Sequence, residues 1–291
     1  MACTTALLWG ILPILLKFGL KEFSIETVAW SRFAFAFIVL GVWLHMRGKV
    51  EVERKLPWLG VLGGAFLATN YYFMTAGIHL SGPSNAAVLI QLAPLLLVLV
   101  GVFAFGEGLT KRQLLGIAIA ALGFLLFYKD NLQSSSDANN YSWAGINVVL
   151  AAVAWVAFMI CQKILIPHHA PQVLNFIAYG VAGLVLLPFV EWAGFSQLSL
   201  GGFALLILLG LNTVFAYGAL AEAVQRIPLT LISVITALNP LITLMGMKLL
   251  STYFPGNLEP GEPSAMGYWG AFLAVTGVVT VVTQKATRKE S

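Results

Sequence analysis

The stretch that decides the fold is residues 6–20, ALLWGILPILLKFGL, which carries a single charge, Lys17, in fifteen positions. A shift of 146 residues places this stretch on residues 152–166, AVAWVAFMICQKILI. Trp9 then falls on Trp155 and Lys17 falls on Lys163. Apolar runs of about 20 residues are typical of membrane helices. The stretch therefore predicts a membrane-spanning helix and, at the same time, an internal repeat.

The repeat extends over four helices of each half without a gap. At the same offset the matched pairs are Gly64 with Gly210, Tyr71 with Tyr217, Val88 with Val234, Leu92 with Leu238 and Pro94 with Pro240. Matches of Leu and Val arise by chance in apolar chains, whereas matched Trp, Lys, Tyr and Pro are hard to obtain by chance. The register then changes, because Gly116 aligns with Gly270, which makes the second half about eight residues longer.

The composition of the 291-residue chain excludes a water-soluble globular domain. The chain is 59% hydrophobic and 10% charged, whereas soluble chains are about 45–50% apolar and about 25% charged. The apolar runs lack the two-residue period of barrel strands. The net charge of +4 comes from basic residues at the ends of apolar runs, where membrane topology requires them, so we expect no nucleic-acid partner. Two cysteines, Cys3 and Cys161, form neither a disulfide framework nor a metal site, and we expect no metal and no cofactor.

The expected architecture is an all-α integral membrane protein with ten transmembrane helices in two inverted five-helix repeats. The helices are expected at 4–20, 27–46, 57–79, 83–105, 111–128, 143–165, 172–192, 202–225, 229–250 and 266–284. The first repeat covers residues 1–128, a polar linker 129–142, and the second repeat 143–291. Since each repeat has an odd number of helices, the second enters the membrane from the opposite side. Inverted repeats are common in secondary transporters, with a substrate site near the midplane between the halves.

The distribution of Lys and Arg predicts that both termini face the cytoplasm. With that orientation, eleven basic residues lie at inner ends: Arg47, Lys49, Arg54, Lys55, Lys111, Arg112, Lys163, Arg226, Lys285, Arg288 and Lys289. Five lie at outer ends: Lys17, Lys21, Arg32, Lys129 and Lys248. A bias of this kind in short loops sets the orientation of membrane proteins.

Several motifs resemble the drug/metabolite transporter superfamily, in its EamA-like ten-helix branch. These motifs are Trp9-Gly10, Arg32 at the start of the second helix, Ala93-Pro94 in the fourth, and Phe105-Gly106-Glu107-Gly108-Leu109-Thr110 leading to Gln113 and Gly116. The chain departs from the pattern in its second half, which reads Thr252-Tyr253-Phe254-Pro255 where the family usually repeats a Gly-Glu turn. The resemblance is closest to bacterial exporters of aromatic and other amino acids. It implies a carrier in the bacterial inner membrane that exports amino acids and related small metabolites by alternating access. The oligomeric state does not follow from the sequence, and a monomer is one possibility.

The positions of the carboxylates favour uncoupled transport. Asp130 and Asp137 fall in the expected linker, and the glutamates fall in loops or at helix ends, Glu222 in the last turns of the eighth helix. Proton-driven antiporters usually carry a titratable group within the membrane. We therefore expect downhill facilitated diffusion, and a proton-coupled drug or metabolite antiporter is the alternative.

Polar and aromatic residues that recur in the middle of the spans are the candidates for a substrate site. They are Trp9, Asn70, Tyr71, Tyr72, Asn85, Gln91, Trp155, Tyr179, Tyr217 and Asn239. Aromatic rings and amides offer stacking faces and hydrogen bonds without fixed charge. The structural interpretation stays open for each, because tryptophans also anchor helices at the membrane interface and amides also bridge helices. Candidate hinge and gating residues are Pro94, Pro240, Glu222 and Arg226. The prolines are expected to kink their helices, and Glu222 with Arg226 is equally an ion pair on one helix face.

Three other functions are less compatible with the sequence. A membrane enzyme would need a buried catalytic cluster, yet the four histidines, His45, His79, His168 and His169, fall at helix ends. A carrier of phosphorylated sugars would need paired cations in its cavity, and no pair of basic residues falls in mid-span. A channel or scaffold is disfavoured by the inverted repeat, although the repeat does not exclude it.

Overall fold

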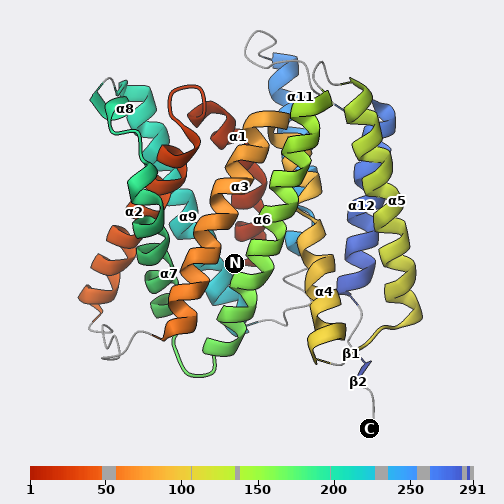
Figure 1. Ribbon diagram of the computed structural model, residues 1–291, viewed down its shortest axis with the longest axis horizontal. Coiled ribbons are helices and arrows are strands. Elements are labelled where there is room, and N and C mark those ends of the chain that lie inside the picture. The colour runs from red at the N-terminus through yellow and green to blue at the C-terminus, as the bar shows by residue number, and fades with distance from the viewer. Residues whose placement is uncertain are drawn as a thin grey trace.

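The computed structural model describes residues 1–47, 57–105, 107–134, 138–196, 198–226, 235–253, 263–283 and 287–288. These residues form a helical bundle (Figure 1). The helices are α1 Ala2–Gly19, α2 Ile25–Met46, α3 Trp58–Leu89, α4 Leu92–Phe105, α5 Lys111–Ser134, α6 Ala138–Leu165, α7 Pro171–Leu186, η1 Leu187–Phe189, α8 Ala193–Ser196, α9 Leu200–Arg226, α11 Asn239–Tyr253 and α12 Ala265–Val282. Two short strands, β1 Glu107–Gly108 and β2 Thr287–Arg288, pair antiparallel.

The long apolar helices make this an integral membrane protein. In the described part of the chain, seven helices are long and apolar enough to cross a bilayer, and α3 with α4 adds an eighth span if this bent pair counts as one. The expected number of ten spans depends partly on residues 229–234, which lie outside the described residues. The number of spans therefore stays a prediction, as does the inverted repeat.

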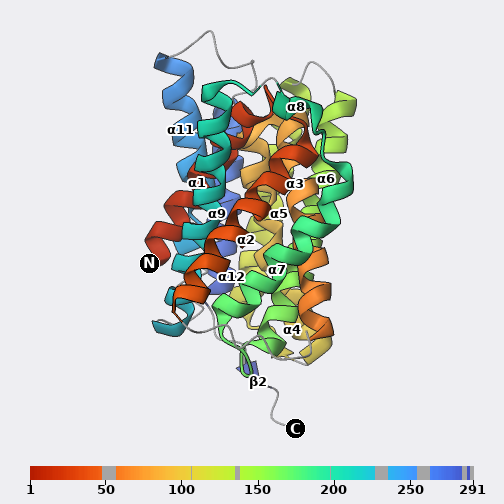
Figure 2. The same ribbon diagram turned by 90° about the vertical axis from the view of Figure 1, so that its left-hand side faces the viewer.

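The helices pack in neighbouring groups around the centre of the bundle. The main contacts join α3 to α6 and α7, α1 to α9 and α11, α2 to α7 and α9, and α5 to α12. Figure 2 shows α1, α9 and α11 on one side of the bundle and α3 and α6 on the other. The pair α5 and α12 lies at one edge (Figure 1), so it borders the bundle and leaves the centre to the other helices.

Small residues allow α5 and α12 to pack backbone against backbone. A Cβ placed on Gly123 would lie against the backbone nitrogen of Ala274, and one on Gly277 would lie against that of Ala120. A Cβ on Gly116 would lie 2.9 Å from the carbonyl oxygen of Gly277. Close approach through small residues is the usual way in which membrane helices gain van der Waals contact.

The ends of α5 and α6 extend into the residues expected to form the central linker. Helix α5 continues to Ser134 and α6 begins at Ala138, whereas the sequence suggested irregular chain over 129–142. Asp130 lies in this extension of α5, and its carboxylate accepts hydrogen bonds from the backbone N–H and the hydroxyl of Ser264, the N-cap residue of α12. Asp130 is therefore a buried helix residue that ties α5 to α12.

Two helix breaks lie just ahead of Pro94 and Pro240, in addition to an interruption of α3 at Gly82. Gly82, with φ of 82°, interrupts α3, and a turn at Ile90–Gln91 then separates α3 from α4, which are bent by 52°. A turn at Ala237–Leu238 likewise precedes α11. Pro94 and Pro240 lie in the first turns of α4 and α11. Each break thus lies in the turn just before its proline, where the missing backbone N–H removes a hydrogen bond to the residue four positions earlier and can kink or break a helix. A role of the two prolines as hinges stays a prediction.

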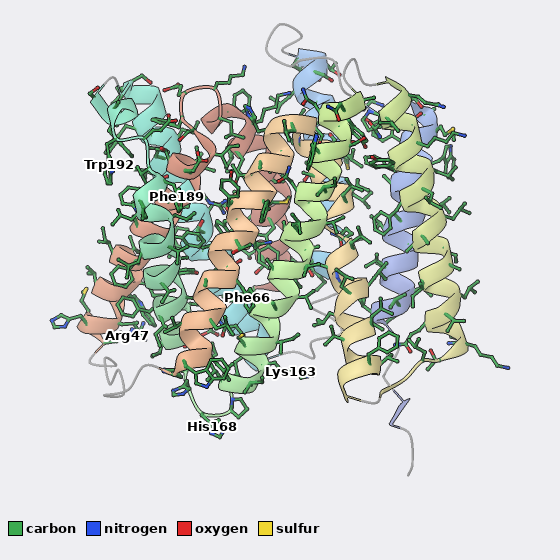
Figure 3. All side chains as sticks on the ribbon, viewed as in Figure 1. Arg47, Phe66, Lys163, His168, Phe189 and Trp192 are labelled. Atoms are coloured by element: carbon green, nitrogen blue, oxygen red, sulfur yellow. The ribbon has the colours of Figure 1, made fainter. Side chains whose placement is uncertain are left out.

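Charged and aromatic residues mark the two ends of the bundle. Arg47, Lys163 and His168 lie toward the lower end of Figure 3, whereas Phe189 and Trp192 lie higher, along the edge formed by α2, α7 and α8. Lys17 is in the last turn of α1 and Lys163 is in the last turn of α6. Figure 1 shows α1 ending at the upper end and α6 ending at the lower end.

Candidate functional site

A cavity of about 160 Å³ lies where the two helix breaks meet the middle of the bundle. This volume is well above the ~10–15 Å³ that one water molecule requires. Its described lining residues come from α1, α2, α3, α4, α6, α9, α11 and the two breaks: Trp9, Leu12, Pro13, Leu16, Arg32, Asn70, Tyr71, Met74, Thr75, Ile78, Ala87, Ile90, Gln91, Ala93, Pro94, Trp155, Tyr217, Thr236, Asn239 and Thr243. A mostly apolar cavity with a few convergent polar groups is typical of a small-molecule site.

Arg32 is the only charged residue among the described residues that line the cavity. Its side chain is 3% exposed, and its Nε–H donates a hydrogen bond of 3.1 Å to Oγ1 of Thr213 on α9. Its Cζ lies 4.3 Å from the centre of the Tyr71 ring. The expectation that Arg32 lies at an outer helix end was wrong. Helix α2 begins at Ile25, with Ser24 as its N-cap, which carries Arg32 about two turns into the helix.

Aromatic rings form much of the cavity wall. Trp9 on α1 meets Tyr217 on α9 edge to face, with ring centres 5.6 Å apart. Tyr71 on α3 packs against Phe33 with ring centres 4.2 Å apart. Trp155 on α6 also lines the cavity. The two tryptophans and the two tyrosines matched by the repeat therefore all line one cavity, which offers flat apolar faces to a bound molecule.

Some polar groups of the lining are already satisfied. Asn70 donates from Nδ2 to the carbonyl oxygen of Ala151 at 2.8 Å. Thr75 donates to the carbonyl oxygen of Tyr71, and Thr243 donates to that of Gly10, at 2.7 and 2.6 Å. These bonds join helices or stay within one helix, so they help to shape the wall.

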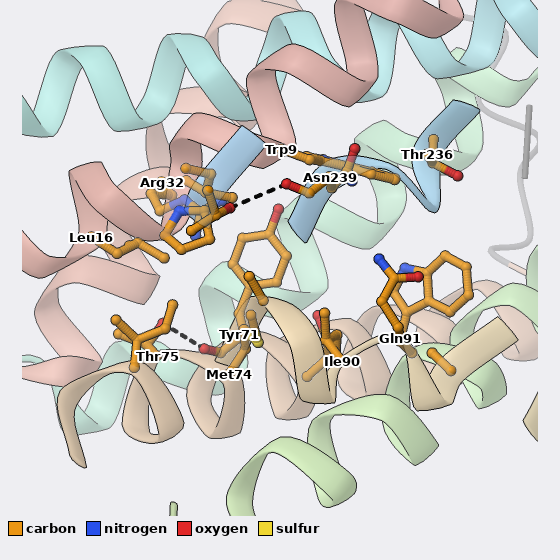
Figure 4. Close-up of a pocket in the computed structure, with 18 of the residues that line it drawn as sticks. Trp9, Leu16, Arg32, Tyr71, Met74, Thr75, Ile90, Gln91, Thr236 and Asn239 are labelled. Atoms are coloured by element: carbon orange, nitrogen blue, oxygen red, sulfur yellow. Dashed lines mark hydrogen bonds between the residues drawn. The ribbon is translucent and has the colours of Figure 1, made fainter. Parts of the chain in front are cut away.

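Two amides at the helix breaks differ from these satisfied groups. Gln91 lies in the first break and is 5% exposed. Among the described residues its side chain has no hydrogen-bond partner. Asn239 is the first residue of α11, and its buried Oδ1 also lacks a partner. Figure 4 shows Gln91, Asn239, Tyr71 and Arg32 around the same space.

Three of the ten predicted substrate residues do not line the cavity. Tyr72 is next to Tyr71 on α3, and adjacent helical residues point about 100° apart, so Tyr72 packs beside Phe73 instead. Asn85 donates to the carbonyl oxygen of Ser81 and accepts from the Tyr141 hydroxyl, which makes it a bridge to α6. Tyr179 is 1% exposed and packs behind the wall against Tyr217.

The four predicted hinge and gating residues have different places in the structure. Pro94 lines the cavity and Pro240 is buried next to the lining residue Asn239. Glu222 is half-buried on α9 and is absent from the described lining. Arg226 is the last residue of α9, and its side chain lies outside the described residues, as does the departure from the family pattern after Tyr253.

Arg32, Thr75, Thr236 and Thr243 are the polar lining residues that are absent from the ten sequence candidates. A signal for Arg32 was present, because Ser24 and Thr27 form a helix-start pattern and place the arginine inside the apolar run. For the threonines the sequence carries no comparable signal. Threonine occurs throughout the chain, and only packing decides which hydroxyls reach the cavity.

The comparisons with known proteins agree with a membrane carrier. An inner membrane transporter of Escherichia coli K12, named YhbE and called uncharacterized, is 34% identical over 285 residues, which cover 96% of this chain and 89% of that protein. A protein of Haemophilus influenzae named as an uncharacterized transporter is 28% identical over 281 residues, which cover 96% and 92% of the two chains. An Escherichia coli K12 protein named as a probable amino-acid metabolite efflux pump is 25% identical over 192 residues, which cover 65% of this chain and 61% of that protein.

A solved structure and a family model complete the comparison. A crystal structure matches with a TM-score of 0.68 and 20% identity, over 96% of this chain and 94% of the chain in that structure. At that identity the match shows a shared fold alone. The model of the EamA-like transporter family matches residues 1–129 and 142–283. The family and the names of the relatives indicate a transporter rather than an enzyme. Since the matched segments span most of its length, this chain belongs to the EamA-like transporter family.

Proposed function

We propose that this protein is a carrier that exports aromatic and other neutral amino acids, with related small metabolites, across the bacterial inner membrane. The observation that carries the proposal is the cavity at two helix breaks, which is walled by Trp9, Tyr71, Trp155 and Tyr217. Discontinuous helices at the centre of a bundle are a common way for transporters to build a substrate site. The name of the efflux pump relative supports an amino-acid substrate, and the names of several relatives support the inner membrane.

The mechanism that fits this site is alternating access between two inverted five-helix halves. The breaks at Ile90–Gln91 and Ala237–Leu238 are 147 residues apart, close to the offset of 146 residues that aligns the halves. Helices α1 and α6, which correspond in the repeat, end at opposite ends of the bundle. These two observations support the inverted arrangement. In the proposed mechanism both termini face the cytoplasm, as the distribution of Lys and Arg indicates, and one monomer is the transport unit.

Transport is proposed to be uncoupled, because no carboxylate occurs among the described residues that line the cavity. A proton-coupled carrier would need a titratable group on the substrate path. The lining instead supplies rings, amides and one arginine, whose charge does not change within the physiological pH range. The described lining thus offers no carboxylate or histidine that would take up or release a proton in that range.

Counterflow in liposomes tests this function. Purified protein is reconstituted in liposomes loaded with unlabelled Phe, Thr or Met, and uptake of the labelled amino acid is followed with and without a pH gradient. We expect exchange that saturates, with no accumulation driven by the gradient. Accumulation that an uncoupler abolishes would support the proton-coupled antiporter instead. No exchange of any amino acid would refute the proposed substrate class.

A further inference from the structure

The guanidinium of Arg32 is a buried cation without a buried anion. Among the described residues it forms no ion pair, and its hydrogen-bond partner is the neutral hydroxyl of Thr213. The side chain is 3% exposed and lies in the cavity wall. Charged side chains within the membrane are costly and usually pair with another group or mark a substrate path. The charge of Arg32 therefore calls for a partner that the described part of the protein does not supply.

The contacts of Arg32 leave its terminal nitrogens available to a ligand. Arginine has five N–H donors, and one of them, Nε–H, is used by Thr213. The hydroxyl of Thr213 itself donates to the carbonyl oxygen of Leu209 at 3.1 Å, so its oxygen is positioned to accept from Arg32. No hydrogen-bond partner for the two Nη groups occurs among the described residues. A guanidinium with two free Nη groups matches a carboxylate in bidentate geometry.

The same contacts hold the guanidinium in one orientation. Its Cζ lies 4.3 Å from the centre of the Tyr71 ring, and the bond to Thr213 fixes the Nε side. Stacking on an aromatic face together with one fixed N–H is a role that arginine fills and lysine does not. The group is thus held in place before any ligand arrives.

The lining also holds an acceptor that suits a positively charged amino group. The buried Oδ1 of Asn239 has no partner, and Asn239 and Arg32 border one cavity (Figure 4). An amide oxygen accepts hydrogen bonds, whereas the ammonium group of an amino acid only donates them. The cavity therefore contains a donor group for an anion and an acceptor for a cation.

We propose that Arg32 binds the carboxylate of the transported molecule and that Oδ1 of Asn239 accepts from its amino group. This inference rests on the proposed function and narrows its substrate class. The carrier transports α-amino acids and other carboxylates whose remaining part is apolar or aromatic. It discriminates against amines and amides that lack the carboxylate. The aromatic wall of Trp9 and Tyr217 then contacts the body of the substrate.

Substrate analogues on the wild-type protein test this proposal without any substitution. Counterflow of labelled Phe in liposomes is measured in the presence of one of four competitors: unlabelled Phe, phenylalaninamide, phenethylamine or 3-phenylpropionate. We expect the two compounds without a carboxylate to inhibit at least about tenfold more weakly than Phe, since hydrogen bonds to charged groups are the strong ones. We expect 3-phenylpropionate, which keeps the carboxylate and lacks the amino group, to inhibit better than phenethylamine.

Substitutions then assign the effect to Arg32. Arg32→Gln should raise the half-saturation concentration for Phe at least about tenfold and leave inhibition by phenylalaninamide unchanged, and Arg32→Lys should fall between. The matched control is Arg47→Gln. Arg47 follows α2 and stacks on Trp43, with Cζ 5.0 Å from the ring centre, but it is exposed outside the cavity. This control should keep the wild-type half-saturation concentration.

The outcomes separate this proposal from the proposed function. If Phe exchanges but phenylalaninamide and phenethylamine inhibit as well as Phe, the carboxylate proposal is wrong and the carrier function stands. If Arg32→Gln does not fold, as judged by size-exclusion chromatography, the analogue series on the wild-type protein still shows whether the carrier recognises the carboxylate. If no amino acid exchanges, the proposed function fails first and the role of Arg32 fails with it.

Discussion

The close packing of α5 on α12 makes Gly123→Ala a sharp test of the fold. A Cβ at this position would lie 2.7 Å from both Cα of Ala274 and the carbonyl oxygen of Gly270. The backbone nitrogen of Ala274 would lie closer still. Ordinary contact begins near 3.4 Å, so the two helices must separate by at least about 0.7 Å. The clashing atoms belong to the backbone and cannot turn away as a side chain would.

A separation of this size costs a measurable part of the stability. A gap of about 0.5–1 Å already loses a quarter to a half of each dispersion contact, and overpacking a well-packed site typically costs about 1–3 kcal/mol. For domains somewhat smaller than this chain, each kcal/mol lowers the midpoint of thermal unfolding by about 2–4 °C. We therefore expect Gly123→Ala to lower the melting temperature of the detergent-solubilised protein by at least about 2 °C.

The matched control is Gly218→Ala on α9, where a Cβ would meet nothing within 4 Å. Because alanine forms helices better than glycine by up to about 1 kcal/mol, this variant should melt at the wild-type temperature or above it. Neither α5 nor α12 contributes a described lining residue to the cavity, so Gly123→Ala should also keep the wild-type ratio of Phe to Thr counterflow. A Gly123→Ala protein that melts with the wild type would refute the packing argument, and a changed ratio would refute the separation of this helix pair from the site.

Three further predictions concern the cavity, a helix cap and the topology. Trp9→Ala and Trp155→Ala should each depress counterflow of Phe more than that of Thr. The affinity for Phe should fall several-fold to roughly tenfold, because a lost aromatic contact costs about 0.5–1.5 kcal/mol beyond the lost area. Well-folded variants with the wild-type ratio of Phe to Thr counterflow would contradict the cavity assignment. Asp130→Ala removes the carboxylate that accepts from the N–H and the hydroxyl of Ser264, the N-cap residue of α12. It should cost about 1.5–3 kcal/mol, seen as a lower melting temperature, and an unchanged melting temperature would show that this contact contributes nothing. In a protein with Cys3 replaced by Ser, a cysteine at Ser135 should react with a membrane-impermeant maleimide in intact cells and one at Ser291 should not; labelling of both from outside would refute the cytoplasmic termini and the inverted repeat.

The sequence alone determined the class of the protein and most of its helices. Apolar runs in a chain with few charges have one stable environment, the bilayer, where each helix satisfies its own backbone hydrogen bonds. Matched residues at one offset also identified Trp9, Tyr71, Trp155 and Tyr217, which all line the cavity. These features depend on composition and spacing, so they can be predicted without a structure.

Tertiary structure decided which of the mid-span polar residues meet. Tyr71 lines the cavity and Tyr72 does not, because the rotation of α3 against its neighbours selects one face of the helix, and an isolated sequence does not fix that rotation. The sequence predicted kinks at Pro94 and Pro240, and the helix breaks lie just ahead of both residues. The size of each bend depends on how the half-helices pack, which the sequence alone does not fix. Arg32 is the clearest case, since its charge favours a membrane end when α2 is considered alone. Only the stack on Tyr71 and the bond to Thr213, both supplied by other helices, hold it in the cavity wall.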